Sequence, residues 1–404
     1  MVWKRFIESK LKAKLKRFDL VMTLWTQYLD QKHTRTIRNE QKYYEVLAKK
    51  LGIYTLSREE LRTALCKKLL SRGIDVGRKR SLPLHVLYAS HFGEWETFQI
   101  PHALQKFGPV SLYSLPERGF YHERENWLKV RHKLDEDLLN FVRTIHTKRP
   151  IDVFIGYLNG LQVSPVTIQT IGKLGIVTVT FNFDDRLLYR GRKLGGRWTG
   201  SSALASSFDL NLTNSSRSVI KYMVDGGLAM FWPPGANPDF FKPLDLPFEY
   251  DVSFIGANYG SRRDYIKYLR RNGIRVVTFG KGWPSGPVES KKMVEIYSKS
   301  RINLGFSWVG ASSTETCLKG RDFEVPMSGG VYLTTDQPDI YRVYKVGLEV
   351  ETYKSKEDCL QKIRYLLSNP EKCRQMRRAV RKRCVEEHSW EARFKDLFNL
   401  LFFE

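Results

Sequence analysis

The chain has 404 residues, 42% of them hydrophobic and 13% aromatic, which is long enough for two globular domains and too apolar for a globally disordered protein. Its formal net charge is +24, and residues 1–80 alone carry 21 Lys and Arg against 8 Asp and Glu, which suits an anionic partner such as acidic lipid, nucleic acid or an anionic substrate. The five cysteines form no CxxC pair and no apolar run reaches the roughly 18 residues of a membrane span, so we expect a reduced, cytoplasmic protein, with the inner face of the membrane as an open alternative.

Residues 1–80 are predicted to form a basic helical extension. Apolar side chains recur at helical spacing on one stripe, formed by Trp3, Ile7, Leu11, Leu15, Phe18, Met22 and Trp25. Basic residues lie mostly off this stripe, and two interpretations stay open: a helix on an anionic membrane surface, or a helix packed on the main domain with solvated lysines. Further on, Ser57 and Glu60 have the spacing of a capping box, which predicts the start of another helix.

Strands and helices then alternate over residues 81–235. Predicted strands lie at 84–89, 152–155, 177–181 and 208–213, and a predicted helix lies at 164–173. This alternation predicts a mostly parallel, doubly wound sheet. The run from Trp232 to Pro238 holds three prolines and a glycine, and it interrupts the pattern, so we assign residues 236–249 to a linker.

The alternation restarts at Tyr250 and defines a second unit, residues 250–388. Predicted strands lie at 250–255, 275–279, 302–306, 331–334 and 347–353, and consecutive helices are predicted within 356–402. We therefore expect an α/β protein of two Rossmann-like, doubly wound domains facing each other across a cleft. In open α/β sheets, ligands bind at the carboxyl ends of the strands, so the loops that follow strands should hold the site.

Two such loops carry candidate phosphate-binding residues. Gly256 directly follows the 250–255 strand, and Asn258 and Arg262 come next, where a close backbone approach, free N–H groups and a guanidinium could receive a phosphate. Lys281 lies between two glycines after the 275–279 strand and could reach a diphosphate. Ordinary packing explains the same residues, and both interpretations stay open. The pattern is not GxGxxG, which counts against a nicotinamide or flavin enzyme.

The most informative segment is 318–330. It predicts a short helix containing Arg321 and Glu324, and a carboxylate at this edge of a sheet can accept hydrogen bonds from both hydroxyls of a nucleotide ribose. Ser328, Gly329 and Gly330 predict a tight helix-to-strand turn that brings backbone close to the cleft. A solvent-exposed glutamate with a glycine helix cap is the competing interpretation.

From Tyr250 to about Leu397 the sequence resembles the C-terminal domain of GT-B-fold glycosyltransferases, particularly the spore-maturation (CgeB-like) group. The similarity rests on the order and spacing of a set of short motifs: Tyr250–Gly256 with Arg262 and Arg263, Gly280–Trp283, Ser300–Leu304, Arg321–Glu324, Gly329–Gly330 and Glu387–Trp390.

The resemblance implies a glycosyltransferase that uses a UDP- or GDP-sugar as donor substrate, with no cofactor and no metal. It places Glu324 on the ribose and Gly256, Arg262 and Arg321 near the diphosphate or donor sugar. It makes residues 81–235 the acceptor domain, and it has residues 389–404 form a helix that crosses back to that domain. Related retaining enzymes often carry a second Glu eight positions before the ribose-binding one. That position is Thr316 here, with Glu315 displaced by one, so the stereochemical course stays open.

An inverting enzyme needs a base in the N-terminal domain. The candidates are Glu94 and Asp184, with Asp185 and His91 as further options. The acceptor can be a saccharide, a lipid-linked molecule or a protein, and peripheral contact with an anionic membrane is compatible with the basic extension. No motif for specific nucleic-acid recognition is present. A catalytically inactive GT-B scaffold, a basic nucleic-acid binder, and a hydrolase or epimerase on the same fold remain alternatives.

Overall fold

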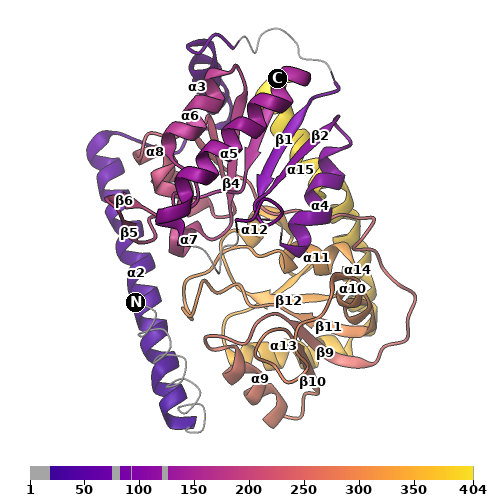
Figure 1. Cartoon of the computed structure of the whole chain (residues 1–404). Helices are drawn as coiled ribbons and strands as arrows, with labels where there is room; N and C mark the ends of the chain where they lie inside the picture. The colour runs from indigo at the N-terminus through magenta and orange to yellow at the C-terminus, as the bar shows by residue number, and fades with distance from the viewer. Residues whose placement is uncertain (1–18, 75–81, 92, 121–125, 404) are drawn as a thin grey trace.

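The computed structural model describes residues 19–74, 82–91, 93–120 and 126–403 (Figure 1). Two parallel sheets, each with helices on both faces, form two Rossmann-like domains stacked one above the other, with the first helices beside them. The predicted α/β fold with two such domains and a helical N-terminal extension is confirmed.

The N-terminal domain is built on a six-stranded parallel sheet. Its strand order is β2-β1-β3-β4-β7-β8, and the strands are β1 (Val86–Ser90), β2 (Val110–Ser114), β3 (Val153–Gly156), β4 (Val177–Asn182), β7 (Leu210–Thr213) and β8 (Ala229–Phe231). The central strands are buried on both faces, as expected for apolar runs covered by helices. The helices of this domain are α4 (Glu94–Leu104), α5 (Trp127–Lys148), α6 (Pro165–Lys173), α7 (Asp185–Leu188) and α8 (Val219–Val224). A short antiparallel hairpin, β5 (Lys193–Leu194) with β6 (Arg197–Trp198), follows α7.

The C-terminal domain is built on a five-stranded parallel sheet. Its strand order is β10-β9-β11-β12-β13, and the strands are β9 (Tyr250–Ile255), β10 (Val276–Phe279), β11 (Ser300–Leu304), β12 (Tyr332–Thr335) and β13 (Glu351–Tyr353). Its helices are α9 (Arg262–Arg271), α10 (Ser290–Lys299), α11 (Arg321–Met327), α12 (Ile340–Val343), α13 (Lys356–Ser368) and α14 (Pro370–Glu387). Strand β9 has the predicted bounds, and the short helix predicted around Glu324 is α11.

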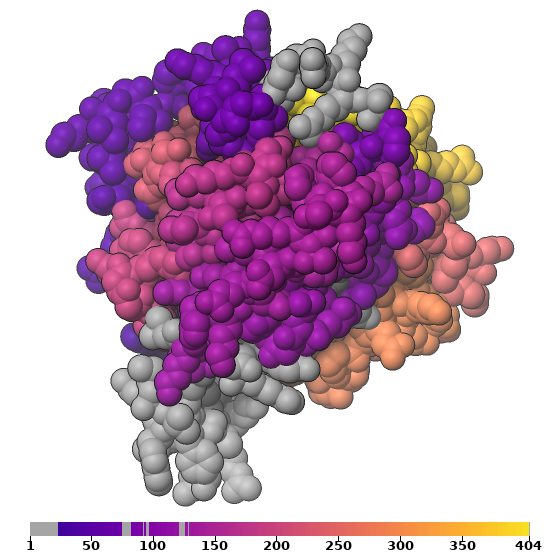
Figure 2. Space-filling model, turned by 45° about the horizontal axis from the view of Figure 1, so that its top comes forward, coloured from indigo at the N-terminus to yellow at the C-terminus, as the bar shows by residue number. Residues whose placement is uncertain are grey.

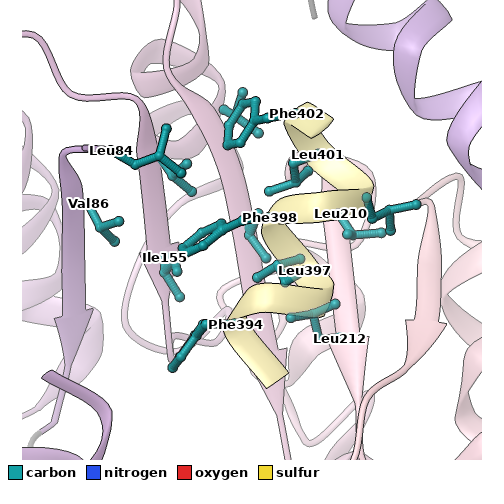
Figure 3. Close-up of a cluster of buried hydrophobic side chains, with 14 of the residues drawn as sticks. Leu84, Val86, Ile155, Leu210, Leu212, Phe394, Leu397, Phe398, Leu401 and Phe402 are labelled. Atoms are coloured by element: carbon teal, nitrogen blue, oxygen red, sulfur yellow. The ribbon is translucent and has the colours of Figure 1, made fainter. Parts of the chain in front are cut away.

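The last helix, α15 (Trp390–Phe398), lies against the N-terminal sheet. The Ser389 side chain caps its first turn by accepting a hydrogen bond from the amide of Ala392 at 3.0 Å. A π-helical turn, η3 (Asn399–Phe403), continues it. Side chains of both elements pack on β1, β3 and β7 in one apolar core (Figure 3), whose labelled members are Leu84, Val86, Ile155, Leu210, Leu212, Phe394, Leu397, Phe398, Leu401 and Phe402. In the space-filling view the C-terminal residues, in yellow, lie beside the N-terminal domain (Figure 2).

The segment between the domains is packed rather than loose. Trp232 is 1% exposed, and its ring lies 5.7 Å from that of Trp390 and 5.5 Å from that of Phe394, between ring centroids. Ala236 is also buried and forms an isolated parallel bridge with Ser389. The prolines therefore follow the last strand of the N-terminal sheet, and the same segment packs against the returning C-terminal helix.

The extension contains a long helix, α2 (Asp19–Leu51), followed by α3 (Arg58–Leu70). The predicted capping box is present at the start of α3, where the Ser57 hydroxyl accepts from the Glu60 amide and the Glu60 carboxylate accepts from the Ser57 amide. Most of the predicted apolar stripe falls on residues 1–18, outside the described residues. Its last member, Trp25, is 42% exposed on α2. Within the described part of the chain, no helix has the length and apolar character needed to cross a membrane.

Candidate functional site

A cavity of about 210 Å³ lies between the two domains, and we call it the central cavity. From the N-terminal domain it is lined by Tyr157, Phe183, Asp184 and Asn214, which follow β3, β4 and β7 directly. These are carboxyl ends of parallel strands, the edge at which α/β sheets bind ligands. The other walls come from the proline-rich run Trp232–Pro238, the end of the β11–α11 loop, α11 and two further helices, through Gln99, Pro234, Gly235, Leu318, Lys319, Gly320, Glu324 and Trp390.

Glu324 presents its carboxylate to the central cavity from the first turn of α11. Gly320 makes room for it, because a Cβ at that position would lie 3.1 Å from the Glu324 Oε1 atom. Behind it is the buried phenol of Tyr297, whose pKa is raised well above its usual range by burial and then by the charge of Glu324. The carboxylate thus has a fixed place in the cleft and can accept hydrogen bonds from a ligand.

Lys319 adds a positive charge to the same wall, and it was not among the residues predicted from the sequence to bind the donor. Its amide donates to the Asp322 carboxylate at 2.6 Å, which fixes the backbone just before α11. Burial opposes its charged form, but the nearby ionisable groups of Cys317, Tyr259 and Asp184 outweigh this and raise the pKa of Lys319. The available signal was its position, directly before the Arg321–Glu324 motif in the loop that follows β11.

A second cavity, of about 410 Å³, lies within the N-terminal domain, and we call it the N-terminal cavity. Its lining includes Tyr157 and Asp184, which also line the central cavity, so the two spaces meet at these residues. The rest of the lining mixes polar side chains with leucines and glycines: His91, Leu158, Asn159, Leu161, Gln162, Asn182, Leu188, Gly191, Thr199, Gly200 and Ser201. Its amide and hydroxyl groups can form hydrogen bonds with a ligand that carries hydroxyls, and its leucines offer apolar contact.

The four candidate bases lie in different surroundings. Asp184 is exposed at the junction of the two cavities, and His91 lines the N-terminal cavity. Asp185 is fully buried, where it accepts from the Tyr222 hydroxyl at 3.0 Å, so it does not face the cleft. Glu94 begins α4, but its side chain lies outside the described residues.

The two glycine loops predicted to receive phosphate lie against each other. The Asn258 amide donates to the Lys281 carbonyl at 2.8 Å, and a Cβ on Gly280 would lie 2.5 Å from the Gly256 carbonyl oxygen. Gly256 also makes room for Arg321, whose guanidinium stacks on the Phe254 ring at 5.2 Å. The Lys281 side chain is exposed and lines neither cavity.

The Arg262 side chain makes its contacts within the protein. It is 2% exposed, donates to the Ala257 carbonyl and the Tyr259 hydroxyl at 2.8 Å each, and stacks on the Tyr259 ring at 3.9 Å. Burial lowers its pKa to about 10. Its guanidinium therefore holds the loop after β9, and neither cavity is lined by it.

Ser328, Gly329 and Gly330 require a correction. They do form the predicted turn, with Gly329 at φ 66°, but the turn precedes β12 and so lies at the amino edge of the sheet, opposite the cleft. Atoms added at the two glycines would meet Pro243, Asn303 and Val325, and the Ser328 hydroxyl bonds to the Glu324 carbonyl inside α11. The backbone of this turn does lie close to other atoms, as expected, but those atoms belong to the linker and the core and not to the cleft.

Glu315, the carboxylate beside the family's second Glu position, is paired with arginines outside the central cavity. It forms an ion pair with Arg186 of α7 at 2.6 Å and with Arg38 of α2 at 2.8 Å. Thr316 forms an isolated antiparallel bridge with Trp308. Neither residue lines the central or the N-terminal cavity. Among the described side chains, no group of three or more His, Cys, Asp or Glu is arranged to hold a metal ion.

Comparison with known proteins gives the class of this architecture. Sucrose-phosphate synthase from Thermosynechococcus elongatus is 12% identical over 79% of this chain and 99% of its own, with a TM-score of 0.59. A glycosyltransferase from Rickettsia africae is 11% identical over 80% and 98%, with a TM-score of 0.57, and Anabaena HepE, solved with UDP and glucose, is 10% identical over 79% and 99%, with a TM-score of 0.53. The fold is that of the GT-B glycosyltransferases.

The sequence adds a second finding. Residues 262–399 match the family model described as glycosyl transferase-like, and this similarity covers the part of the C-terminal domain that holds Lys319 and Glu324. No curated protein matches the chain.

Proposed function

We propose that the protein transfers a sugar from a nucleoside-diphosphate sugar to an acceptor hydroxyl in the cleft between its domains. The observation that carries the proposal is the junction of the two cavities. The central cavity has a cation and a carboxylate from the glycosyl transferase-like domain, Lys319 and Glu324, and the N-terminal cavity meets it at Asp184. A donor on one side and an acceptor on the other would place the reacting atoms beside Asp184.

In this proposal the C-terminal domain binds the donor. Glu324 accepts hydrogen bonds from the ribose hydroxyls, and Lys319 lies beside the diphosphate, with Arg321 behind it. Charge builds up on the diphosphate as the bond to the sugar breaks, and a fixed cation in a partly closed site stabilises that charge. UDP- or GDP-sugar is the proposed donor, and the reaction needs neither a metal nor a cofactor.

We assign Asp184 as the base. The acceptor oxygen attacks the anomeric carbon while its proton passes to the Asp184 carboxylate, and the electron pair of the breaking glycosidic bond leaves with the diphosphate. This reaction inverts the anomeric centre. The commitment of Glu315 to Arg186 and Arg38 supports this assignment, because that carboxylate is not directed at the donor.

The finer assignments rest on the resemblance. We propose a CgeB-like enzyme of the cytoplasm that acts on a saccharide, lipid-linked or protein acceptor in envelope synthesis. The basic extension supports peripheral contact with an anionic membrane.

Turnover of the full chain with UDP-, GDP-, ADP- and dTDP-sugars tests the proposal, with release of the free nucleoside diphosphate as the signal and mass spectrometry of candidate acceptors as the product assay. Asp184→Asn should bind the donor and lose at least about a hundredfold in kcat, which is the usual contribution of a general base. Asp264→Asn, an exposed carboxylate on α9, is the matched control. Donor binding without turnover in the wild type would favour an inactive scaffold, and release without any acceptor would favour a hydrolase.

A further inference from the structure

Helix α2 runs along both domains (Figure 1). Its C-terminal half belongs to the N-terminal domain: Glu40 accepts from the buried Lys221 ammonium at 2.8 Å, and the Tyr44 hydroxyl donates to Asp225 at 2.8 Å. The Tyr44 ring packs edge-on against Tyr189 at 5.3 Å between centroids. This half is fixed to α7 and α8 by buried contacts.

The preceding turns of the same helix contact the C-terminal domain at residues 309–317, with the hydrogen bonds made to residues 311–315. The Ala311 amide donates to His33 Nδ1 at 2.9 Å, and the Ser313 amide donates to the Asp30 carboxylate at 2.9 Å. One turn on, the Arg38 guanidinium donates to Glu315 at 2.8 Å and to the Thr314 hydroxyl at 3.1 Å. Two backbone amides of one loop thus have side chains of α2 as their acceptors.

Glu315 is the point where three separate segments meet. Its side chain is 8% exposed and pairs with Arg186, which is 2% exposed and belongs to α7 of the N-terminal domain. Arg38 of α2 binds the other carboxylate oxygen. One buried carboxylate therefore ties the C-terminal domain to the N-terminal domain both directly and through α2.

The tied loop continues into the wall of the central cavity. Cys317 packs with the fully buried Ile37 of α2, and the Leu318 carbonyl accepts from the Asn214 amide at 2.8 Å. The next two residues, Lys319 and Gly320, line the cavity. Residues 311–315, which α2 holds, therefore lie only four to eight positions before Lys319 in the chain.

We infer that α2 is a strap that fixes the donor wall of the cleft, and that Glu315 is a positioning residue through which Arg38 and Arg186 set the place of Lys319. The inference rests on the proposed function for its effect on the donor, but the strap itself is a property of the fold. In this inference Glu315, the carboxylate next to the family's second Glu position, holds the two domains together.

Hydrogen exchange of the full chain tests the strap without reference to activity. Arg38 is exposed enough to be replaced without unfolding, so Arg38→Met should speed exchange in peptides covering residues 309–317 by about 1.5- to fivefold, the range expected for a pair with one exposed partner. Arg35→Met removes the same charge one turn earlier on the exposed face of α2 and should change nothing. Equal exchange in the wild type and both variants would overturn the inference.

Kinetics then tests the link to Lys319. Arg38→Met should raise the donor KM by about 1.5- to fivefold with kcat unchanged. Arg38→Lys should recover part of the loss, because it keeps the charge but not the forked contact to Glu315 and Thr314. Faster exchange with an unchanged KM would overturn the positioning role and keep the strap. Absence of any donor turnover in the wild type would count against the proposed function alone, since the exchange result stands without it.

Discussion

Arg186 and Glu315 form an ion pair of 2.6 Å between the two domains, with both side chains almost fully buried. Burial, and then the charge of Arg217, lowers the pKa of Arg186, so its guanidinium depends on Glu315 and on the amide oxygen of Gln41 at 3.0 Å. A buried charge that loses its partner is costly, and this pair therefore couples the stability of the two domains.

Glu315→Gln should lower the free energy of unfolding by about 3–5 kcal/mol, because it leaves Arg186 with only neutral acceptors close to it. Urea unfolding measures the loss. Arg186→Met combined with Glu315→Gln should be less unstable than the sum of the two single variants, since the double change removes both charges. Additive single effects would contradict the assignment of the pair.

Lys319→Met should weaken donor binding by about ten- to a hundredfold, the range that corresponds to losing one charge-assisted hydrogen bond of about 1.5–3 kcal/mol. Calorimetric titration with the nucleoside diphosphate measures it. Lys281→Met is the informative comparison, because Lys281 is the lysine that the sequence favours and its side chain is exposed outside both cavities. If Lys281→Met alone weakens binding, the account of this wall is wrong.

Gly280→Ala should destabilise the protein by about 3 kcal/mol or more. Its φ of 121° disfavours any side chain, and the new Cβ would lie 2.5 Å from the Gly256 carbonyl oxygen. Gly286→Ala is the matched control in the same loop: its φ is 66°, no atom lies within 4 Å of the added Cβ, and the cost should be only about 1–2 kcal/mol. Thermal unfolding of the two variants compares them, and equal losses would refute the close contact of the loops.

His388 predicts a pH dependence of stability. Its Nε2 lies 2.8 Å from the Val343 carbonyl oxygen and its Nδ1 accepts from Arg393 at 2.8 Å, which fits only the neutral ring. Burial, and then the charge of Arg393, lowers the pKa of His388 to about 3, below the ordinary value of 6.5. The unfolded chain therefore takes up a proton first, so this contribution is complete above pH 6.5 and is lost toward pH 3 at about 1.4 kcal/mol per unit.

His388→Gln removes this titration. Between pH 7.0 and 5.5 the free energy of unfolding, measured by urea titration, should fall more in the wild type than in the variant, by about 1.3 kcal/mol. Parallel pH profiles would mean that the ring is charged or accessible in the folded protein.

The sequence predicted the fold well where local signals are strong. The apolar run Tyr250–Ile255 next to Gly256 has the length and the stop of a buried strand, and β9 has those bounds. Strand β2 was not recognised, because it is an edge strand with Leu112 exposed and a mixed pattern, and β8 has only three residues before the prolines.

Some of the candidate site residues line the cleft and others do not. Glu324 and Asp184 line the cleft because the edge at which they lie follows from strand order alone. The partners of Glu315 come from segments more than a hundred residues apart in the chain, so no local pattern could reveal them. The Ser328–Gly330 turn shows a further limit: glycines report that something lies close, but not whether it is a ligand or Pro243.

The central claim is that a nucleotide sugar binds beside Glu324, and thermal stability of the full chain against a panel of UDP-, GDP-, ADP- and dTDP-sugars tests it most directly. A donor at about 100 times its Kd should add about 2.7 kcal/mol and raise the unfolding midpoint by a few degrees, and Glu324→Ala should abolish the shift without changing the midpoint of the free protein by a similar amount. A shift that persists in Glu324→Ala, or no shift with any of the donors, would contradict the account.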